Sequence, residues 1–567
     1  MNVGLVGSGP AAEAARAALS DVDATVTTDP EALSETDLGV VVAPTGAEQF
    51  TQADDVCDRL VACEIGGVGG HPLGGVDAAV SVYTSESARF ADLSLRVAST
   101  VDETASRPSG DRSAVRFAGA VAGRRAVRLL AGDPLGGTVV EVPGEERQFF
   151  PVPDGRRDRT LDRSWRSVPL NDALARAEQA LDARVGLLTQ VGERESFPIP
   201  YYLARTADTT RYSDARAAAF AAGADPDWDR AFVKALGEGL ERYCAGVYRQ
   251  SEFVVAPETN RARPVSPARF ARPDGYRQVD REEPIPWVEG EHLVTGEEVS
   301  LPAEFVHYPP PEERHKPAIT TGLGLGNSGV EALLSGLYEV VERDATMLAW
   351  YSTFEPLGLA VDDDRFETLV KRARAEELTV TPLLVTQDVD VPVVGVAVHR
   401  DPERSSDDAW PRFAMGSGAS LDPVDAARSA LAEALQNWME LRAMGPEQAA
   451  EEKAAIGNYA AFPPHAQRFV DVDVTVPAAS VGPEPLPDGE TELAAVVDRV
   501  TEAGLDAYAA RTTTRDVAGL GFEAVRVLIP EAQPLFTGEP FFAERAESVP
   551  RELGFDPRLE REYHPYP

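Results

Sequence analysis

The chain contains very little lysine. Four of its 54 Lys and Arg residues are lysine, against 93 Asp and Glu, and the formal net charge is -39. Such an acidic chain argues against nucleic acid as a partner, because phosphate contacts need a basic face. Acidic surplus with arginine in place of lysine predicts a halophilic protein, in which carboxylates hold water and cations while salt screens their repulsion. An ordinary acidic protein is the alternative.

Cysteine and long apolar runs are also scarce. Cys57, Cys63 and Cys244 fit neither a disulfide framework nor a tetrahedral zinc site, so we expect small buried residues. No apolar run approaches the ~18 residues of a transmembrane helix. Met1–Val6 looks like a strand without the basic region of a signal peptide. We therefore expect no membrane segment and a cytoplasmic location.

The N-terminal region alternates between strand and helix signals. Strands are predicted near 3–6, 24–28 and 38–43, and helices near 11–19, 52–62, 85–99 and 114–130. This alternation predicts a small Rossmann-like α/β domain over residues 1–130. Gly7-x-Gly9-x-x-Ala12 matches a dinucleotide fingerprint, and Asp29 stands where an acidic ribose ligand would be. A degenerate domain that handles a partner or peptide, a true dinucleotide site and a purely structural turn all remain open.

The rest of the chain predicts a connector and a larger domain. Residues 131–169 are rich in Gly, Pro and Arg, which indicates an irregular connector or short hairpins, and the larger domain then runs over 170–567. Helices are predicted near 171–182, 226–248, 330–351 and 423–442, and strands near 380–385, 391–398, 412–415 and 524–529. The mixture indicates an α/β and α+β fold class.

Three of these helices repeat one chemical pattern, in which two acidic or amide side chains stand three residues apart. Positions i and i+3 share a helix face, so each helix would offer a pair of oxygen ligands. Grouped carboxylates repel one another unless a cation lies among them, and hard oxygen ligands suit Mg²⁺. The pattern predicts a Mg²⁺–nucleotide site built from helix faces: Glu238 and Glu241, Glu339 and Glu342, and Glu433 and Gln436.

The order and wording of these segments resemble the YcaO family. Its members carry a glycine-rich segment, here Thr320–Ser328, before an ExxERD helix, here Glu339–Asp344. A GxGA segment, here Gly416–Ala419, then precedes a helix with Arg428, Glu433 and Gln436. The resemblance covers about residues 170–567 and is specific, because three separated motifs match in order.

The resemblance implies a large ATP-binding domain in which the acidic helix pairs hold Mg²⁺ against the triphosphate. Glu238, Glu241, Glu339, Glu342 and Glu433 become the metal ligands and, with Gln436, the ATP site. Arg242, Arg343 and Arg428 become candidates for phosphate or carboxylate pairing, although each could instead brace a neighbouring helix. Many relatives have a Gly–Lys–Gly element, whereas this chain has Ala221–Ala–Gly–Ala224. Arg211, Arg216 or Lys234 could replace the missing lysine.

The implied activity is cyclodehydration of a ribosomally made peptide to thiazoline or oxazoline rings. A Cys, Ser or Thr side chain attacks the preceding carbonyl, the resulting oxyanion takes the γ-phosphoryl group of ATP, and phosphate then leaves. Ring-forming members often end in a proline-rich tail, which Pro565 and Pro567 match in shortened form. The tail could deliver a terminal carboxylate as a base, or it could be a frayed end. We expect His564 to be solvent-exposed.

The alternatives are thioamidation with a TfuA-type partner, and a non-catalytic scaffold that keeps the nucleotide-binding fold. Besides the precursor peptide, the resemblance implies a leader-binding, dehydrogenase or TfuA-like partner and a homodimer. It also implies that the N-terminal domain is a degenerate relative of E1-like domains.

Overall fold

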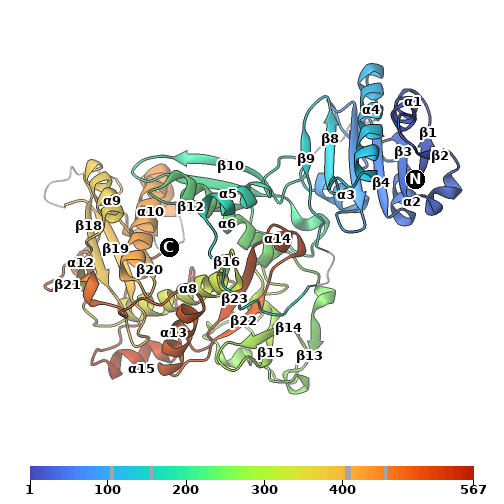
Figure 1. Cartoon of the computed structure of the whole chain (residues 1–567). Coiled ribbons are helices and arrows are strands. Elements are labelled where there is room, and N and C mark those ends of the chain that lie inside the picture. Colours follow the sequence, from blue (N-terminus) through green and yellow to red (C-terminus); the bar gives the residue numbers. More distant parts are fainter. Residues whose placement is uncertain (102–106, 154–156, 402–409, 452–455) are drawn as a thin grey trace. The chain divides into compact units, whose positions relative to one another are not determined.

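The computed structural model describes residues 1–101, 107–153, 157–401, 410–451 and 456–567 (Figure 1). Its helices and strands form two compact units, which are treated separately below. The first comprises Met1–Asp154, Glu178–Gln190 and Arg205–Ala219, and the second comprises Gly155–Ala177, Val191–Ala204 and Phe220–Pro567. The predicted mixed α/β and α+β class is confirmed. No described helix is long and apolar enough to cross a membrane.

The first unit contains a seven-stranded sheet in the order β2-β1-β3-β4-β7-β8-β9. Its first four strands are parallel and the other three pair antiparallel. Alternate strand residues feed two apolar clusters, one shared with α1 and α4 and the other with α2 and α3, so helices cover both faces. The strands are β1 (Asn2–Gly7), β2 (Thr25–Thr27), β3 (Leu38–Pro44), β4 (Arg59–Ile65), β7 (Ala78–Thr84), β8 (Thr138–Val142) and β9 (Glu146–Gln148), and the helices are α1 (Pro10–Leu19), α2 (Glu48–Val56), α3 (Phe90–Ala98) and α4 (Arg112–Leu130).

One helix of this unit differs from the sequence prediction. The helix expected near 52–62 ends at Val56, and residues 59–65 form the buried strand β4. A continuous apolar run fits a helix or a buried parallel strand equally well, so only its tertiary neighbours decide. In the region expected to form a connector or short hairpins, β8 and β9 are such a hairpin, and they extend the sheet. The glycine-rich segment 66–75 includes the short hairpin β5 (Gly67–Val68) and β6 (His71–Pro72).

The fingerprint residues lie in the turn between β1 and α1. Gly7 and Gly9 have φ angles of 138° and 83°, in the region that favours glycine. Asp29 accepts a hydrogen bond from the backbone N–H of Glu31 at 3.1 Å and so caps a short 3₁₀ turn. A local structural role thus accounts for Asp29, and dinucleotide binding stays a prediction. All three cysteines are buried and free, as expected.

The second unit is built on two sheets with α8 (Gly329–Trp350) against both of them (Figure 1). One sheet has the order β13-β14-β22-β23-β16, with β15 also on β14, and the other has the order β20-β19-β18-β17-β21. Residues of α8, β19, β23 and α13 share one apolar core. The strands are β13 (Val254–Ala256), β14 (Ile285–His292), β15 (Glu298–Pro302), β16 (Leu323–Gly326), β17 (Leu357–Ala360), β18 (Thr379–Leu384), β19 (Val393–His399), β20 (Phe413–Ala419), β21 (Thr475–Pro477), β22 (Tyr508–Arg511) and β23 (Glu523–Leu528).

The three motif helices predicted from the sequence are confirmed. They are α6 (Trp228–Gly246), α8 and α10 (Pro423–Glu451), the last with a kink at Gly445. A further sheet has the order β10 (Leu188–Glu195), β11 (Tyr201–Thr206) and β12 (Phe220–Ala224). The other helices are α5 (Leu170–Glu178), α7 (Ala303–Val306), α9 (Asp364–Ala375), α11 (Ile456–Tyr459), α12 (Pro464–Val470), α13 (Gly489–Glu502), α14 (Arg515–Gly519) and α15 (Arg545–Glu552).

Candidate active site

Three strand–helix pairs of the second unit pack in the same way: β12 with α6, β16 with α8, and β20 with α10. In each pair, a glycine of the strand faces the helix backbone. It lies against the carbonyl oxygen of the helix residue that stands eight positions after the glycine in the sequence. A Cβ atom on Gly223, Gly324 or Gly418 would lie 2.4, 2.2 or 2.6 Å from the carbonyl oxygen of Ala231, Ala332 or Ala426, respectively. Only glycine permits this close approach, so the register of all three pairs is the same.

The shared register places the same functional positions at the same height on each helix. The first side chain of each motif stands fifteen positions after the glycine and accepts a hydrogen bond from a backbone N–H of the strand segment. These bonds are Ala222 N to Glu238 (3.2 Å), Gly322 N to Glu339 (3.0 Å) and Ser417 N to Glu433 (2.6 Å). The sequence showed the repeated acidic spacing of all three helices but not their common register on the strands. The aligned glycines were the signal for this register.

The three helix faces meet at one cavity of about 520 Å³. All six acidic or amide positions singled out in the sequence line this cavity: Glu238, Glu241, Glu339, Glu342, Glu433 and Gln436. Arg343 lines it as well, so a guanidinium group faces the same space as the carboxylates. Residues separated by almost 200 positions therefore contribute to one polar chamber within the second unit.

Arg343 and Ser417 connect the second motif to the third. Arg343 donates to the Ser417 hydroxyl at 3.2 Å and to Glu433 Oε1 at 3.4 Å, and lies 3.3 Å from Glu342 Oε1. The Ser417 hydroxyl donates to Glu342 Oε1 at 2.7 Å. Ser417 was part of a quoted motif, but its side chain was not identified as a site residue. Its position between Gly416 and Gly418 of β20, where the strand approaches the helix, was the feature of the sequence that could have identified it.

Arg242 holds the carboxylates of its own helix. Its Nη2 donates to Glu238 Oε1 at 3.2 Å, and its Nη1 lies 3.7 Å from Glu241 Oε1. Arg242 is not among the residues that line the cavity. It therefore braces the first motif from behind.

Burial dominates the electrostatics of the carboxylates. It raises the pKa of Glu241 to about 8 and that of Glu342 to about 7, against the opposing effects of Arg242 and Arg343 respectively. Burial also raises the pKa of Glu238. The Arg343 guanidinium is buried too, yet the carboxylates of Glu342 and Glu433 raise its pKa, so it stays charged. The chamber thus holds negative charge that a bound cation would stabilise.

The lining suits a magnesium–phosphate group by its chemistry. Six carboxylates and two amides, with Glu331 and Asn327 beside the six predicted positions, offer the hard oxygen ligands that Mg²⁺ prefers. Arg343 supplies a fork for phosphate oxygens. Among the residues that the structure describes, no three His, Cys, Asp or Glu side chains are already arranged to hold a metal ion. The carboxylates are paired with arginine and with backbone N–H groups instead.

Arg428 also lies outside the cavity, and its contacts are with α9 and its own helix. Its guanidinium binds Asp363 through two nitrogen atoms and Asp425 at 2.6 Å. Asp363 is also the N-cap of α9, since it accepts from the backbone N–H of Phe366 at 2.8 Å. Arg428 therefore fastens α10 to α9, the bracing role that remained open for each arginine.

Replacing Arg428 with Met should lower stability without weakening nucleotide binding. The Arg428 hydrogen bonds hold the pKa of Asp363 at about 2, below its ordinary 3.8. A depressed carboxyl pKa stabilises the fold above the unfolded value and loses that effect as pH falls toward 2. We expect R428M to lose about 1–2 kcal/mol near neutral pH, and less near about pH 3, in urea unfolding. A large change in Mg·ATP affinity would contradict this role.

The missing lysine has one possible replacement at the cavity. Lys234 lines it and forms an ion pair with Asp225 at 2.7 Å. Arg216 instead pairs with Asp208, and neither Arg211 nor Arg216 lines the cavity. Lys234 therefore stands where it could reach a phosphate group, whereas Arg211 and Arg216 belong to the first unit.

The C-terminal segment is packed into the second unit. Pro565 is buried, Pro567 is partly buried and Tyr566 is 1% exposed. The Tyr566 ring lies against Gly395 of β19, which pairs with Ser417 of β20, so the segment comes close to the back of the chamber. His564 is buried, contrary to expectation, and its Nε2 lies 2.8 Å from the carbonyl oxygen of Phe536. Burial lowers the pKa of His564 to about 4, so it is neutral near neutral pH.

Two curated relatives share part of this sequence. An uncharacterized protein of Methanothermobacter thermautotrophicus is 31% identical over 225 residues, or 37% of this chain and 54% of the relative. A protein of Rhizobium leguminosarum bv. trifolii, described as lying in the tfuA 3′ region, is 30% identical over 27% of this chain and 39% of its own length. The chain thus spans about half or less of the length of these relatives.

Solved structures with the same fold cover more of the chain. A heterocyclase in complex with substrate and cofactor has a TM-score of 0.72 at 18% identity, over 98% of this chain and 83% of its own. YcaO from Methanopyrus kandleri, bound with AMPPCP and Mg²⁺, has a TM-score of 0.51 at 25% identity, over 66% of this chain and 95% of its own.

The family described as YcaO cyclodehydratase, ATP- and Mg²⁺-binding, matches residues 222–533. This range begins at the β12–α6 pair, contains the other two strand–helix pairs and includes every residue that lines the chamber except Ala173 and Ala177. By its sequence match and by the three aligned motifs around one acidic chamber, this chain belongs to the YcaO family.

Proposed function

We propose that this chain uses ATP and Mg²⁺ to activate a backbone amide of a ribosomally made peptide and closes thiazoline or oxazoline rings. The convergence of three acidic helix faces and Arg343 on one chamber carries this proposal. Membership of an ATP- and Mg²⁺-binding family supports it. Hydrolysis through a Ser–His–Asp or Cys–His nucleophile is not needed, because the substrate side chain is itself the nucleophile.

The lining residues divide the work of holding the nucleotide. Glu238, Glu241, Glu339, Glu342 and Glu433 would hold Mg²⁺, and Gln436 would orient it or the nucleotide. Bound there, Mg²⁺ neutralises charge that moves through the phosphates. Arg343 is charged and faces the chamber, so it can stabilise the transferred phosphoryl group.

The C-terminal segment contributes by position. Tyr566 lies against Gly395 of β19, beside the strand that holds Glu342 and Glu433 through Ser417, and Pro565 is buried next to it in the sequence. Proline fixes φ, so the segment Pro565–Pro567 keeps its shape at little entropic cost. We assign Pro565 and Pro567 to exclusion of water from the reacting amide and to its orientation.

The decisive experiment incubates the purified protein with ATP, Mg²⁺ and Cys-, Ser- or Thr-containing peptides, and follows phosphate release and peptide mass. Ring formation predicts the loss of one water per ring and phosphate release that requires the peptide. Matched peptides with Ala in place of Cys, Ser and Thr serve as the control and should give neither signal. Phosphate release that is independent of the peptide would contradict the proposal, and no turnover with any peptide and partner would favour a scaffold.

Thioamidation is the second candidate, and one observation favours it. A partial relative is described as lying in the tfuA 3′ region, and TfuA-type proteins are the partners expected for that reaction. With external sulfide and such a partner, the same ATP site would replace one amide oxygen by sulfur. A mass gain of that kind, without loss of water, would select thioamidation over ring formation.

Binding of Mg·ATP should release protons near neutral pH. Glu241 and Glu342 have pKa values of about 8 and about 7, so both are partly protonated at about pH 7, whereas a metal ligand must be ionised. We expect release of roughly one proton at about pH 7 and almost none at about pH 9. Calorimetry in buffers of different ionisation enthalpy measures this number. Glu241→Gln should reduce it, and proton uptake would contradict the assignment.

The remaining assignments follow from the same proposal. The substrate is a precursor peptide, which the N-terminal unit or a leader-binding protein would present, and a dehydrogenase or a TfuA-like protein would act beside it. We also propose a homodimer in a high-salt cytoplasm, consistent with the net charge of -39.

A further inference from the structure

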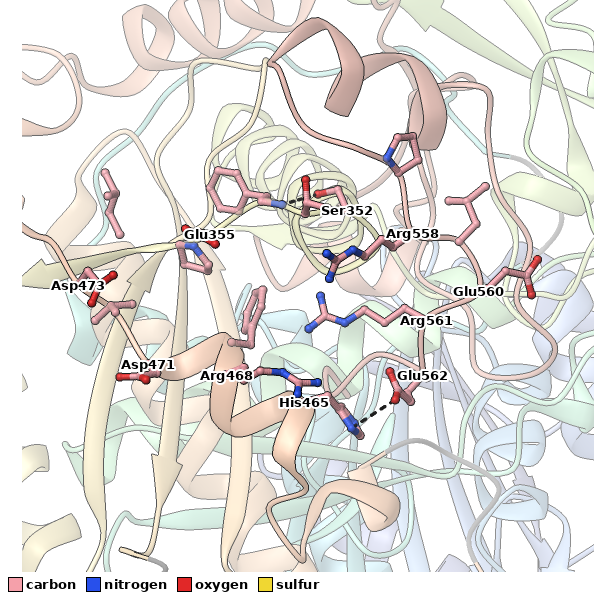
Figure 2. A pocket seen from close by; sticks show the side chains of 18 of the residues that line it. Ser352, Glu355, His465, Arg468, Asp471, Asp473, Arg558, Glu560, Arg561 and Glu562 are labelled. Carbon is pink, nitrogen blue, oxygen red and sulfur yellow. Dashed lines mark hydrogen bonds and ion pairs between the residues drawn. The ribbon is translucent and has the colours of Figure 1, made fainter.

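A second, larger cavity of the second unit lies at the C-terminal end of α8 and has a volume of about 830 Å³ (Figure 2). Its wall combines three segments: residues 352–357 after α8, residues of α12 and the chain just after it, and residues 557–562, which lead into the buried C-terminal segment. None of these residues lines the acidic chamber. Ten residues of helix, or roughly 15 Å, separate Glu342 from Ser352.

Three arginines converge on this cavity: Arg468, Arg558 and Arg561 (Figure 2). Arg561 is anchored, since it donates to the carbonyl oxygen of Trp350 at 2.6 Å and its guanidinium carbon stacks 3.9 Å from the centre of the Trp350 ring. No ion pair with an acidic side chain of the described residues is made by any of the three. Other arginines of this acidic chain form ion pairs with carboxylates, as Arg428 does with Asp363 and Arg545 does with Asp344.

A role in closing the helix end accounts for Arg561 alone. Its hydrogen bond satisfies a free carbonyl group of the last turn of α8. The guanidinium groups of Arg468 and Arg558, which are exposed residues, have no such partner in the described parts of the chain, and Arg558 lies close enough to Arg561 to repel it. Burial and the nearby charge of Arg558 lower the pKa of Arg561, and burial, opposed by Glu562, lowers that of His465. An anion between the arginines would relieve this repulsion.

The rest of the wall indicates which anion fits. Phe354 and Phe469 supply apolar surface, and Leu357 and Val474 are 38% and 56% exposed beside it. Acidic side chains surround the arginines, including Glu355, Asp471, Asp473 and Glu560 (Figure 2). These carboxylates disfavour a polyanion, and the volume exceeds what a free phosphate fills. A peptide segment with one carboxylate and neighbouring apolar side chains fits this wall. It supplies an anion for the arginines, carries little negative charge and is large enough for the volume.

We propose that this cavity binds a peptide segment that carries a single carboxylate, with Arg468, Arg558 and Arg561 on that carboxylate and the aromatic wall on a neighbouring apolar side chain. The guanidinium fork matches a carboxylate with two parallel hydrogen bonds. This inference rests on the proposed function, because it makes the cavity a second contact for the peptide substrate outside the acidic chamber. Residues 557–562 line the cavity and continue into the segment beside Gly395, so an occupant contacts the chain that leads to that chamber.

The test measures fluorescence anisotropy of two labelled octapeptides without ATP. The peptides contain Leu and Phe and differ at one position only, which is Glu in the acidic peptide and Gln in the other. The wild-type protein should bind the acidic peptide at least about tenfold more tightly, and R468Q/R558Q should abolish that difference. The matched control R365Q/R374Q removes two exposed arginines of α9 and should keep it.

Three results would overturn the inference. Equal binding of the two peptides would remove the role of the carboxylate, and an unchanged preference in R468Q/R558Q would place the site elsewhere. Full displacement of the acidic peptide by millimolar inorganic phosphate would indicate a simple anion site. The assay contains no nucleotide, so its result does not depend on whether the protein turns over ATP. Conversely, a failure to bind the peptide at this cavity would not affect the assignment of the acidic chamber as the ATP site.

Discussion

Replacing Glu342 with Gln should reduce ATP-dependent turnover by roughly 1,000-fold, because it removes one ionisable oxygen ligand from the centre of the chamber. The side chain keeps its shape and can still accept the hydrogen bond from Ser417 that Glu342 accepts at 2.7 Å. Steady-state phosphate release with peptide substrate measures the effect. The loss should appear in kcat/KM and be accompanied by weaker Mg·ATP binding in calorimetry.

The stability of this variant should move the other way. Burial raises the pKa of Glu342 to about 7, so its ionised form opposes folding as pH rises through that value. E342Q should therefore unfold at the same or a higher temperature than the wild type above about pH 7. Glu492→Gln is the matched control, since Glu492 accepts a hydrogen bond from Tyr338 at 2.6 Å but does not line the chamber. Equal losses in both variants, or unfolding of E342Q, would remove the catalytic interpretation.

Removal of Pro565–Pro567 should lower turnover by roughly 100-fold while Mg·ATP affinity changes little. Tyr566 is buried against Gly395, and no residue of the segment Pro565–Pro567 lines the chamber. Loss of the segment would open the back of the chamber to water and leave the peptide amide unpositioned. Parallel measurements of phosphate release and of Mg·ATP binding separate the two effects.

A single substitution provides a milder version of the same change. A Cβ atom on Gly395 would lie 2.9 Å from the Met415 methyl group and 3.4 Å from the Tyr566 hydroxyl, so Gly395→Ala should displace the ring slightly. We expect an intermediate loss of turnover in G395A. A Cβ on Gly538 would meet no atom within 4 Å, so G538A should behave as the wild type. Unchanged turnover after removal of the segment would exclude it from the reaction.

The sequence predicted the motif helices well because their signals are local. Spacing of three between acidic residues sets a helix face, and three such helices in order were enough to indicate one site. The equal register of the three strand–helix pairs was harder to foresee. It depends on the contact of Gly223, Gly324 and Gly418 with helix backbones, which becomes visible only when strand and helix are placed together.

The arginines show where sequence reasoning ends. Arg343 and Arg428 both stand on motif helices next to acidic residues, and the guanidinium group suits phosphate and carboxylate alike. The choice depends on Asp363, which lies 65 positions before Arg428 and is brought to it by the packing of α9 on α10. In the same way, residues 59–65 are a strand because their neighbours in the sheet are strands, not because of their own pattern. Tertiary partners decided both cases.

The most direct test of the acidic chamber is a crystal structure of the complete chain with Mn²⁺ in place of Mg²⁺ and a non-hydrolysable ATP analogue. Anomalous scattering locates the metal without reference to the protein atoms. This account predicts Mn²⁺ at about 2.1–2.2 Å from carboxylate oxygens of at least two of the three motif helices, with Arg343 on a phosphate oxygen. Metal and nucleotide bound outside the space between Glu238, Glu339 and Glu433 would contradict it.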